Sequence, residues 1–343
     1  MGSNRVMALA IFARYFAPVA LAVATVVPAH ATNGDLNAQF DSVIGSSSSA
    51  QRDLTAHYDT ALTQQIAQLA ADDRGRIGVA AIDLTTGKVV SVLGNQRFPL
   101  ASTSKIAIAA TFLAGVDQGK WSLDDSYPMM ITSTRQGRTM SARDLIELAI
   151  TRSDNQAADG LLRVVGGPDA VNDWVHRAGI RDFSLDRDIY TLVHEDGAID
   201  PAHQVDMRDS ASPLAMATLL KGLYDGRWLS ASSRNVLLGA MGRCRTGPQR
   251  IPGQLPDGVN VAHKTGTLYD TSSDVGIVTG PEGHAIAMAI YVTGGKNNHK
   301  YRFEKIGSIA RAVYDGYQAQ WPAQAAQVWT NATYPRAAAA AAE

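Results

Sequence analysis

Apolar and polar positions divide the chain into end segments with strand patterns and a middle with helical patterns. At both ends, short runs rich in Val, Ile and Ala are bounded by turn residues such as Thr86-Gly87, which is typical of strands. Each pair of runs is accompanied by a segment with apolar residues at helical spacing. The elements predicted from the ends are, in chain order, a helix at 51–71, strands at 76–84 and 88–93, strands at 273–280 and 285–295, and a helix at 303–318.

The middle of the chain, from Ser102 to about Leu238, has a mainly helical pattern, clearest in 141–151 and 212–224. The early and late strands can pair only if the two chain ends meet in one sheet. We therefore predict an α/β fold, with an antiparallel sheet flanked by helices from both ends and an all-α domain inserted between them. The predicted lobes are an α/β lobe at about 51–97 and 258–320 and a helical lobe at about 98–257. A cleft between such lobes is a favoured place for a small-molecule site.

The first 31 residues have the pattern of an export signal. Arg5 and Arg14 precede an apolar run at 15–27, and small residues at 29–31 predict cleavage after Ala31. The run is short for a membrane span, and no cysteine follows the cleavage point, so we expect no stable membrane anchor. These features predict a periplasmic or secreted protein. Residues 32–50 are expected to form a flexible lead-in and residues 321–343 a disordered tail.

The composition argues against several kinds of partner and site. The 343 residues carry a formal net charge of −1, which gives no reason to expect a nucleic-acid partner. The eight histidines show no ligand spacing, so we expect neither a metal site nor a cofactor. His263 is predicted to be a strand residue rather than a catalyst. The single cysteine, Cys244, can form no internal disulfide and is predicted to be a buried thiol rather than a nucleophile.

Three short motifs carry the candidate chemistry. Ser102 and Lys105 are one helical turn apart at the start of an apolar helix, as a nucleophile and its activator would be. The stretch 153–155 reads Ser-Asp-Asn, and 264–267 reads Lys-Thr-Gly-Thr. Alone, each motif is also compatible with helix capping, a solvent-reaching lysine or a polar edge strand. Together and in this order, they indicate acyl transfer by a nucleophilic serine.

With these motifs the chain resembles a class A β-lactamase, within the wider superfamily of serine β-lactamases and penicillin-binding proteins. The likeness extends from about Gln51 to Gln318 and implies a two-lobed β-lactamase-like fold that forms an acyl-enzyme on Ser102. Lys105 would accept the serine proton, Ser153 would pass a proton to the leaving lactam nitrogen, and Asn155 would hold a side-chain amide of the substrate.

The resemblance also implies how the Lys-Thr-Gly-Thr motif acts. Lys264, Thr265 and Thr267 would bind the carboxylate of a β-lactam, and the backbone N–H groups of Ser102 and Thr267 would form an oxyanion hole. Gly266 would let the strand backbone approach the substrate closely. Counting back from the motif places Arg250 where some members carry a further arginine for the carboxylate, although a surface arginine is an equal alternative.

The sequence departs from the family in the loop that carries the deacylating glutamate. Counting forward from 185–187 (Leu-Asp-Arg) places Ile189 at that position, whereas counting back from Arg208-Asp209 places Asp196 there. We therefore expect a longer loop with an insertion just after Arg187, and Glu195 or Asp196 as the base.

A second departure concerns the residues that hold this loop. Asp159 replaces an asparagine that commonly steadies the loop glutamate in the family, and two facing carboxylates would repel each other unless one were protonated. The loop must therefore be held differently, or the deacylating groups have changed. Arg187 and Asp209 are predicted to tie the neck of the loop.

The sequence thus predicts an exported, cofactor-free serine hydrolase that opens β-lactams, with a monomer as the family default. Two alternatives remain open. One is a D-alanyl-D-alanine peptidase or esterase that uses the same Ser-Lys chemistry. The other is a β-lactam-binding or sensing protein that is acylated but does not turn over.

Overall fold

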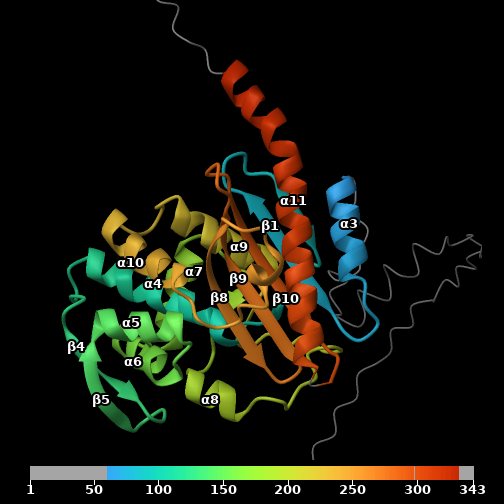
Figure 1. The fold of residues 1–343 in the computed structure, drawn as a ribbon. Helices are drawn as coiled ribbons and strands as arrows, with labels where there is room; N and C mark the ends of the chain where they lie inside the picture. Colours follow the sequence, from blue (N-terminus) through green and yellow to red (C-terminus); the bar gives the residue numbers. More distant parts are fainter. Residues whose placement is uncertain (1–59, 297, 332–343) are drawn as a thin grey trace, which may run out of the picture. The chain divides into compact units, whose positions relative to one another are not determined.

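The computed structural model describes residues 60–296 and 298–331, with side chains up to residue 320. The predicted signal peptide, the lead-in and the first residues of the helix expected at 51–71 lie outside the described residues, as does the end of the chain from residue 332. The described part contains one five-stranded sheet with helices on both faces (Figure 1).

The sheet joins strands from the two ends of the chain, as the sequence predicts. Its order is β2-β1-β10-β9-β8 and every pairing is antiparallel. The early and late strands meet where β1 pairs with β10, with Ala80 opposite Ala289. The strands are β1 (Ile77–Asp83), β2 (Val89–Val92), β8 (Asn260–Leu268), β9 (Thr271–Thr279) and β10 (Ala285–Thr293).

The two faces of the sheet pack against different layers because side chains alternate along a strand. In β10 alternate residues, among them Ile286, Ile290 and Val292, belong to the core under the terminal helices. The alternate residues, such as Ala287 and Ala289, face the core shared with the helical region. Every residue of β10 is buried, which explains its continuous apolar run.

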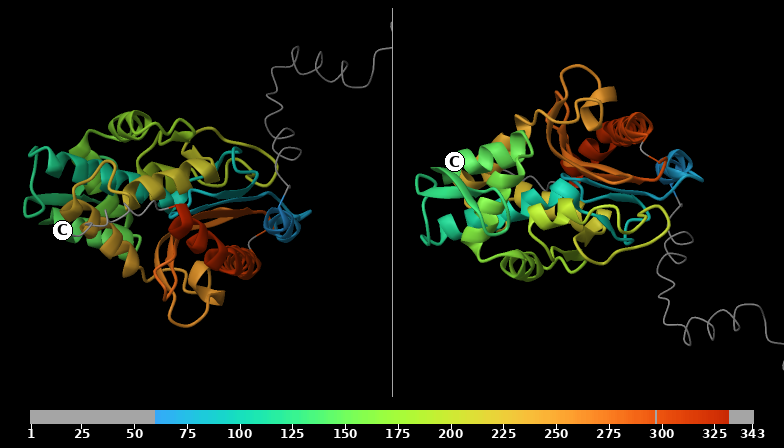
Figure 2. Two further views of the ribbon diagram at one scale, coloured as in Figure 1. Left: turned by 90° about the horizontal axis from the view of Figure 1, so that it is seen from above. Right: turned by 90° about the horizontal axis from the view of Figure 1, so that it is seen from below.

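The terminal helices cover one face of the sheet and pack against each other. They are α3 (Ala61–Ala70) and α11 (His299–Asn331), and Figure 2 shows them together on the outer side of the strands. The backbone of α11 continues to Asn331, beyond residue 320, where the sequence predicts the end of the catalytic domain.

The helical region covers the other face. Its central helix, α4 (Ser104–Asp117), is buried at every position from Ser104 to Gly115. This burial accounts for its sequence, because a helix with apolar residues on all sides belongs in a protein core. The helices around it are α5 (Ala142–Thr151), α6 (Asn155–Val165), α7 (Pro168–Arg177), α8 (Ile189–His194), α9 (Pro213–Tyr224) and α10 (Ala231–Gly242). The helices predicted at 141–151 and 212–224 correspond to α5 and α9.

The middle of the chain also contains short strands that the sequence analysis did not predict. The hairpin of β4 (Ser126–Met130) and β5 (Gln136–Ser141) is buried only at Met129 and Met130, and β5 reads QGRTMS without the apolar alternation that marks a half-buried strand. The others are the two-residue strands β3 (Phe98–Pro99), β6 (Phe183–Ser184) and β7 (Ser210–Ala211). Across the described residues, every helix is too short or too polar to cross a membrane.

Candidate active site

Ser102 lies in a short 3-10 helix, η1 (Ala101–Thr103), that leads directly into α4. Its side chain is half-buried, while its neighbours Ala101 and Thr103 are fully buried. Ala101 has a φ of 47°, which is uncommon for a residue with a side chain. Such backbone conformations are often found at functional sites, because the surrounding structure must hold them in place.

Lys105 lies one helical turn after Ser102, near the start of α4, and only 1% of its surface is exposed. Its Nζ is 2.7 Å from the carbonyl oxygen of Ser153 and 2.6 Å from Oδ1 of Asn155. A neutral amine can donate both of these hydrogen bonds and keep a lone pair for a third group. The structure therefore brings the first two motifs together.

Ser153 lies between two lysines. Its Oγ is 3.3 Å from Nζ of Lys105 and 2.9 Å from Nζ of Lys264. Ser153 has a φ of 60° in the turn between α5 and α6, so this is a second non-glycine residue with a left-handed backbone at the site. The next residue, Asp154, caps α6 by accepting the N–H of Ala157 at 2.8 Å.

The two lysines have lowered pKa values. Burial, followed by the nearby charge of Lys264, lowers the pKa of Lys105 well below its usual range. Burial also lowers the pKa of Lys264 to about 8. The site therefore favours the neutral form of Lys105 more than water does, and this is the form that could accept a proton from Ser102.

The third motif lies on β8, an edge strand of the sheet. A Cβ on Gly266 would lie 3.0 Å from the carbonyl oxygen of Leu100 and 2.4 Å from Oγ of Ser273. Only glycine lets β8 approach the segment before Ser102 this closely. The hydroxyl group of Thr265 is bonded to that of Thr246 at 2.6 Å.

Arg250 is buried beneath the same part of β8 rather than exposed on the surface. Its Nη1 donates to the carbonyl oxygens of Gly266 and Ser273, both at 2.7 Å, and its Nη2 donates to Oγ1 of the exposed Thr267 at 2.6 Å. Its guanidinium also stacks on Phe303, 4.3 Å from the ring centre. Arg250 thus supports the strand backbone and orients Thr267.

The neck of the 187–209 loop is tied by an ion pair, as the sequence predicts. Nε of Arg187 lies 2.7 Å from Oδ2 of the buried Asp209. Oδ1 of Asp209 accepts the backbone N–H groups of Asp186 and Arg187, at 2.8 and 3.0 Å. Because the partners of Asp209 come from the other end of the loop, the two ends are held together.

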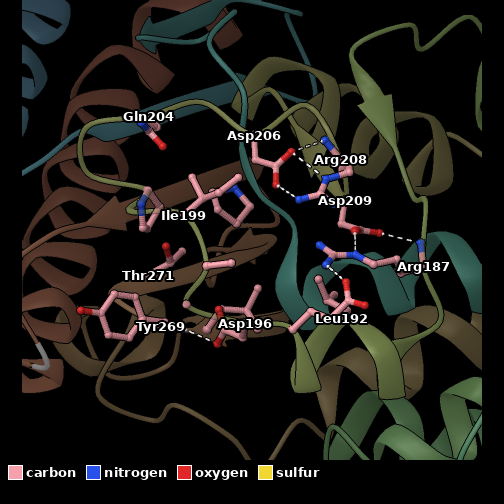
Figure 3. Close-up of a pocket in the computed structure, with 16 residues that line it drawn as sticks. Arg187, Leu192, Asp196, Ile199, Gln204, Asp206, Arg208, Asp209, Tyr269 and Thr271 are labelled. Atoms are coloured by element: carbon pink, nitrogen blue, oxygen red, sulfur yellow. Dashed lines mark hydrogen bonds and ion pairs between the residues drawn. The ribbon is translucent and has the colours of Figure 1, made fainter.

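The two candidate bases on this loop are bound to other groups. Glu195 forms an ion pair with Nη1 of Arg187 at 2.7 Å, and Oδ2 of Asp196 accepts the backbone N–H of Tyr269 at 2.6 Å. Figure 3 shows Asp196 directed toward Tyr269, and both residues line a cavity of about 60 Å³ together with other residues of the loop. Their role in deacylation stays a prediction.

Asp159 holds the 187–209 loop through the start of α8. Its Oδ1 accepts the N–H of Ile189 at 2.7 Å, and its Oδ2 accepts that of Tyr190 at 2.9 Å. Burial raises the pKa of Asp159 to about 6, against the effect of these two donors. The loop is therefore held differently from the family pattern: the carboxylate faces the N–H groups at the start of a helix, a favourable place for an acid.

Replacing Asp159 with alanine should destabilise the protein by about 2 kcal/mol, because the buried N–H of Ile189 and the half-buried N–H of Tyr190 lose their charged acceptor. Asp159→Asn should cost less, since the amide oxygen can still accept one of the two bonds. Thermal unfolding checks the order of stabilities, and limited proteolysis checks whether cleavage moves to the 187–209 loop. Equal stability of both variants and the wild type would show that the two bonds contribute nothing.

The structure thus brings together Lys105, Ser153, Asn155 and Lys264. Ser102 lies one turn before Lys105 in η1, which packs against β8, the strand that carries Thr265 and Thr267. Within the described part of the chain, no group of three or more His, Cys, Asp and Glu residues is arranged to hold a metal ion. The sequence analysis did not identify Thr246, which supports Thr265, or the pairing of His263 with Asp274. Such partners are distant in the sequence and carry no motif.

Comparison with known proteins agrees with this architecture. The sequence pattern of the Beta-lactamase enzyme family matches residues 61–317. The chain is 31% identical to β-lactamase CTX-M-8 of Citrobacter amalonaticus over 265 residues, covering 74% of this chain and 88% of that protein. It is 30% identical to an imipenem-hydrolysing β-lactamase of Enterobacter cloacae over 266 residues, covering 73% and 88%.

Solved structures give the same result. A β-lactamase from Chitinophaga pinensis superposes with a TM-score of 0.68 at 30% identity, covering 75% of this chain and all of that one. An ancestral class A β-lactamase superposes with a TM-score of 0.67 at 33% identity, covering 74% and 99%. This protein therefore belongs to the class A serine β-lactamase family.

Proposed function

We propose that this protein hydrolyses β-lactams through an acyl-enzyme on Ser102. The observation that carries the proposal is the single cluster formed by the three motifs, in which Ser153 Oγ lies 3.3 Å from Lys105 Nζ and 2.9 Å from Lys264 Nζ. A nucleophile at the start of a helix, an amine of lowered pKa one turn away and a hydroxyl shared by two lysines are the groups that amide opening by a serine needs.

In the acylation step, Lys105 takes the proton of Ser102 while Oγ bonds to the lactam carbonyl carbon. The carbonyl oxygen becomes an oxyanion, which backbone N–H groups of Ser102 and Thr267 stabilise. When the C–N bond breaks, Ser153 gives its proton to the nitrogen and regains one from a neighbouring lysine. Lys264, Thr265 and Thr267 bind the substrate carboxylate, with Arg250 adding positive charge from behind Thr267, and Asn155 binds the side-chain amide.

Deacylation requires a water activated by a base, for which we propose Glu195 or Asp196. Either group would have to leave its present partner, Arg187 or the N–H of Tyr269, to reach the ester. The same observation supports a second candidate function, a protein that is acylated by β-lactams and stays so. We also propose that the protein acts in the periplasm or outside the cell, on the basis of the predicted signal peptide.

The test is to follow the purified protein by intact mass after adding benzylpenicillin or nitrocefin, with substrate loss measured in parallel. Many turnovers with little or no lasting adduct would support hydrolysis. A lasting adduct with about one equivalent consumed would overturn it in favour of the binding protein or a peptidase. Neither adduct nor turnover would overturn both.

If wild-type turnover is found, Glu195→Gln and Asp196→Asn should separate the two candidate bases. The variant that lacks the base should accumulate acyl-enzyme, with deacylation slowed by about 100- to 10,000-fold, while acylation continues. The other variant serves as the matched control, since it also loses one loop carboxylate. Rapid deacylation in both variants, and in the double variant, would exclude this pair.

A further inference from the structure

A thiol, an imidazole and a carboxylate form a cluster beside the β8 motif. His263 is on β8, and its Nδ1 lies 2.8 and 2.9 Å from the two carboxylate oxygens of Asp274 on β9. Asp274 is fully buried and also accepts the N–H of Ile251 at 3.1 Å. Cys244 and His263 line the same cavity, and the charge of each side chain acts on the other. A nucleophile, an imidazole and a carboxylate that orients the imidazole therefore lie next to one another in space.

The cluster opens on a cavity at the surface. The cavity has a volume of about 320 Å³, and both Cys244 and His263 line it. Cys244 is partly exposed rather than fully buried as the sequence analysis expected, because the chain after α10 leaves the helical region here. The rest of the lining includes Thr246, Pro252, Val259 and Val261. A small molecule with an apolar part could therefore reach the sulfur atom.

The charges in the cluster favour a thiolate. Burial opposes a charge on His263, but Asp274 outweighs this and raises the pKa of the imidazole to about 10. Burial would raise the pKa of Cys244, but the neighbouring imidazolium outweighs it and lowers that pKa to about 7. His263 therefore stays protonated at neutral pH, and the thiol releases its proton to solvent.

We propose that Cys244 is a modification site for small disulfides, which enter this cavity and form a mixed disulfide with its sulfur. In the exchange, the thiolate of Cys244 attacks one sulfur of the disulfide, and a new S–S bond forms as the old one breaks. The released thiolate takes a proton from solvent. No external oxidant is needed, because one half of the small disulfide stays bound to Cys244 and the other half is released as a free thiol.

Modification would affect the substrate site through two threonines. Sγ of Cys244 is 3.3 Å from Oγ1 of Thr246, which is bonded to Oγ1 of Thr265 at 2.6 Å. A group attached to the sulfur would compete with Thr246 for its place and release the hydroxyl of Thr265. This second step rests on the proposed function, in which Thr265 binds the substrate carboxylate, and it predicts a higher KM after modification.

The first experiment measures the thiolate and its adduct without reference to hydrolysis. Thiolate absorbance of the wild type, with Cys244→Ser as the blank, should titrate near pH 7. Cystamine should add one half-molecule to the wild type and none to Cys244→Ser, as read by intact mass. At pH 6 the wild type should react roughly five-fold faster than His263→Asn. A titration near the ordinary thiol pKa of about 8.5, or no adduct, would overturn the proposal even if His263→Asn failed to fold.

The second experiment tests the coupling. Cystamine-treated wild type should show a raised KM for nitrocefin that a reducing agent reverses, while treated Cys244→Ser should be unchanged. A complete adduct with an unchanged KM would overturn the coupling through Thr246. If the wild type hydrolyses no β-lactam, the adduct measurements still decide the modification site, so the two proposals fail separately.

Discussion

Replacing Ser102 with alanine should reduce nitrocefin hydrolysis by about 10,000-fold or more, because no acyl-enzyme can form without its oxygen. Alanine keeps the backbone N–H at this position, so the fold and the donor that we place in the oxyanion hole should remain. Steady-state kinetics measures the loss, and intact mass after adding benzylpenicillin should show no adduct.

The matched control is Ser104→Ala. The Ser104 hydroxyl is buried and donates to the carbonyl oxygen of Ala101 at 2.8 Å, so its loss should affect stability more than chemistry. This variant should still form the adduct. If Ser102→Ala were acylated as fast as the wild type, the nucleophile would have to be another residue.

Replacing Lys105 with methionine should slow acylation by about 1,000-fold, as expected for the loss of a general base. Lys105→Arg should be equally slow, because a guanidinium stays protonated and cannot accept a proton. Stopped-flow acylation measures both variants. Lys120→Met, which removes an exposed lysine after α4, should leave acylation unchanged. Recovery of activity in the arginine variant would mean that the positive charge of Lys105 matters, and not its basicity.

The same role predicts the pH dependence. Acylation should rise with pH as Lys105 loses its proton, and this rise should occur well below the pH at which an ordinary lysine loses its proton, because burial and Lys264 lower the pKa of Lys105. In Lys105→Met the rise should disappear. A wild-type profile that follows the same curve as the methionine variant would remove Lys105 from the proton transfer.

The sheet could be predicted because its strands carry strong local signals. β10 is buried on both faces and reads as an unbroken apolar run, and β1 is almost as apolar. The hairpin of β4 and β5 has no such signal, because it is buried only at Met129 and Met130, where β4 packs against α6. Where the local sequence pattern is weak, packing against the rest of the protein therefore determines whether a strand forms.

The site was predictable only where motif residues carry it. Ser102, Lys105 and Lys264 lie in short fixed patterns, and the structure brings them to one place. Asp159 could be recognised as unusual, but its bonds to the N–H groups of α8 depend on how the 187–209 loop folds back. The contact of Cys244 with His263 likewise joins positions whose separation in the chain has no recurring pattern.

The pairing of β1 with β10 also has a consequence for how the chain acquires its structure. Ile77 meets Val292, so nearly the whole chain must be synthesised before the two central strands can join. Contacts between such distant segments form slowly, since a long loop must close first. Until then, the edge of β1 that later pairs with β10 has no hydrogen-bond partner. In this incompletely folded state the chain would be open to proteases and chaperones, and the active site would not yet be assembled, because Lys264 on β8 would still be apart from Ser102.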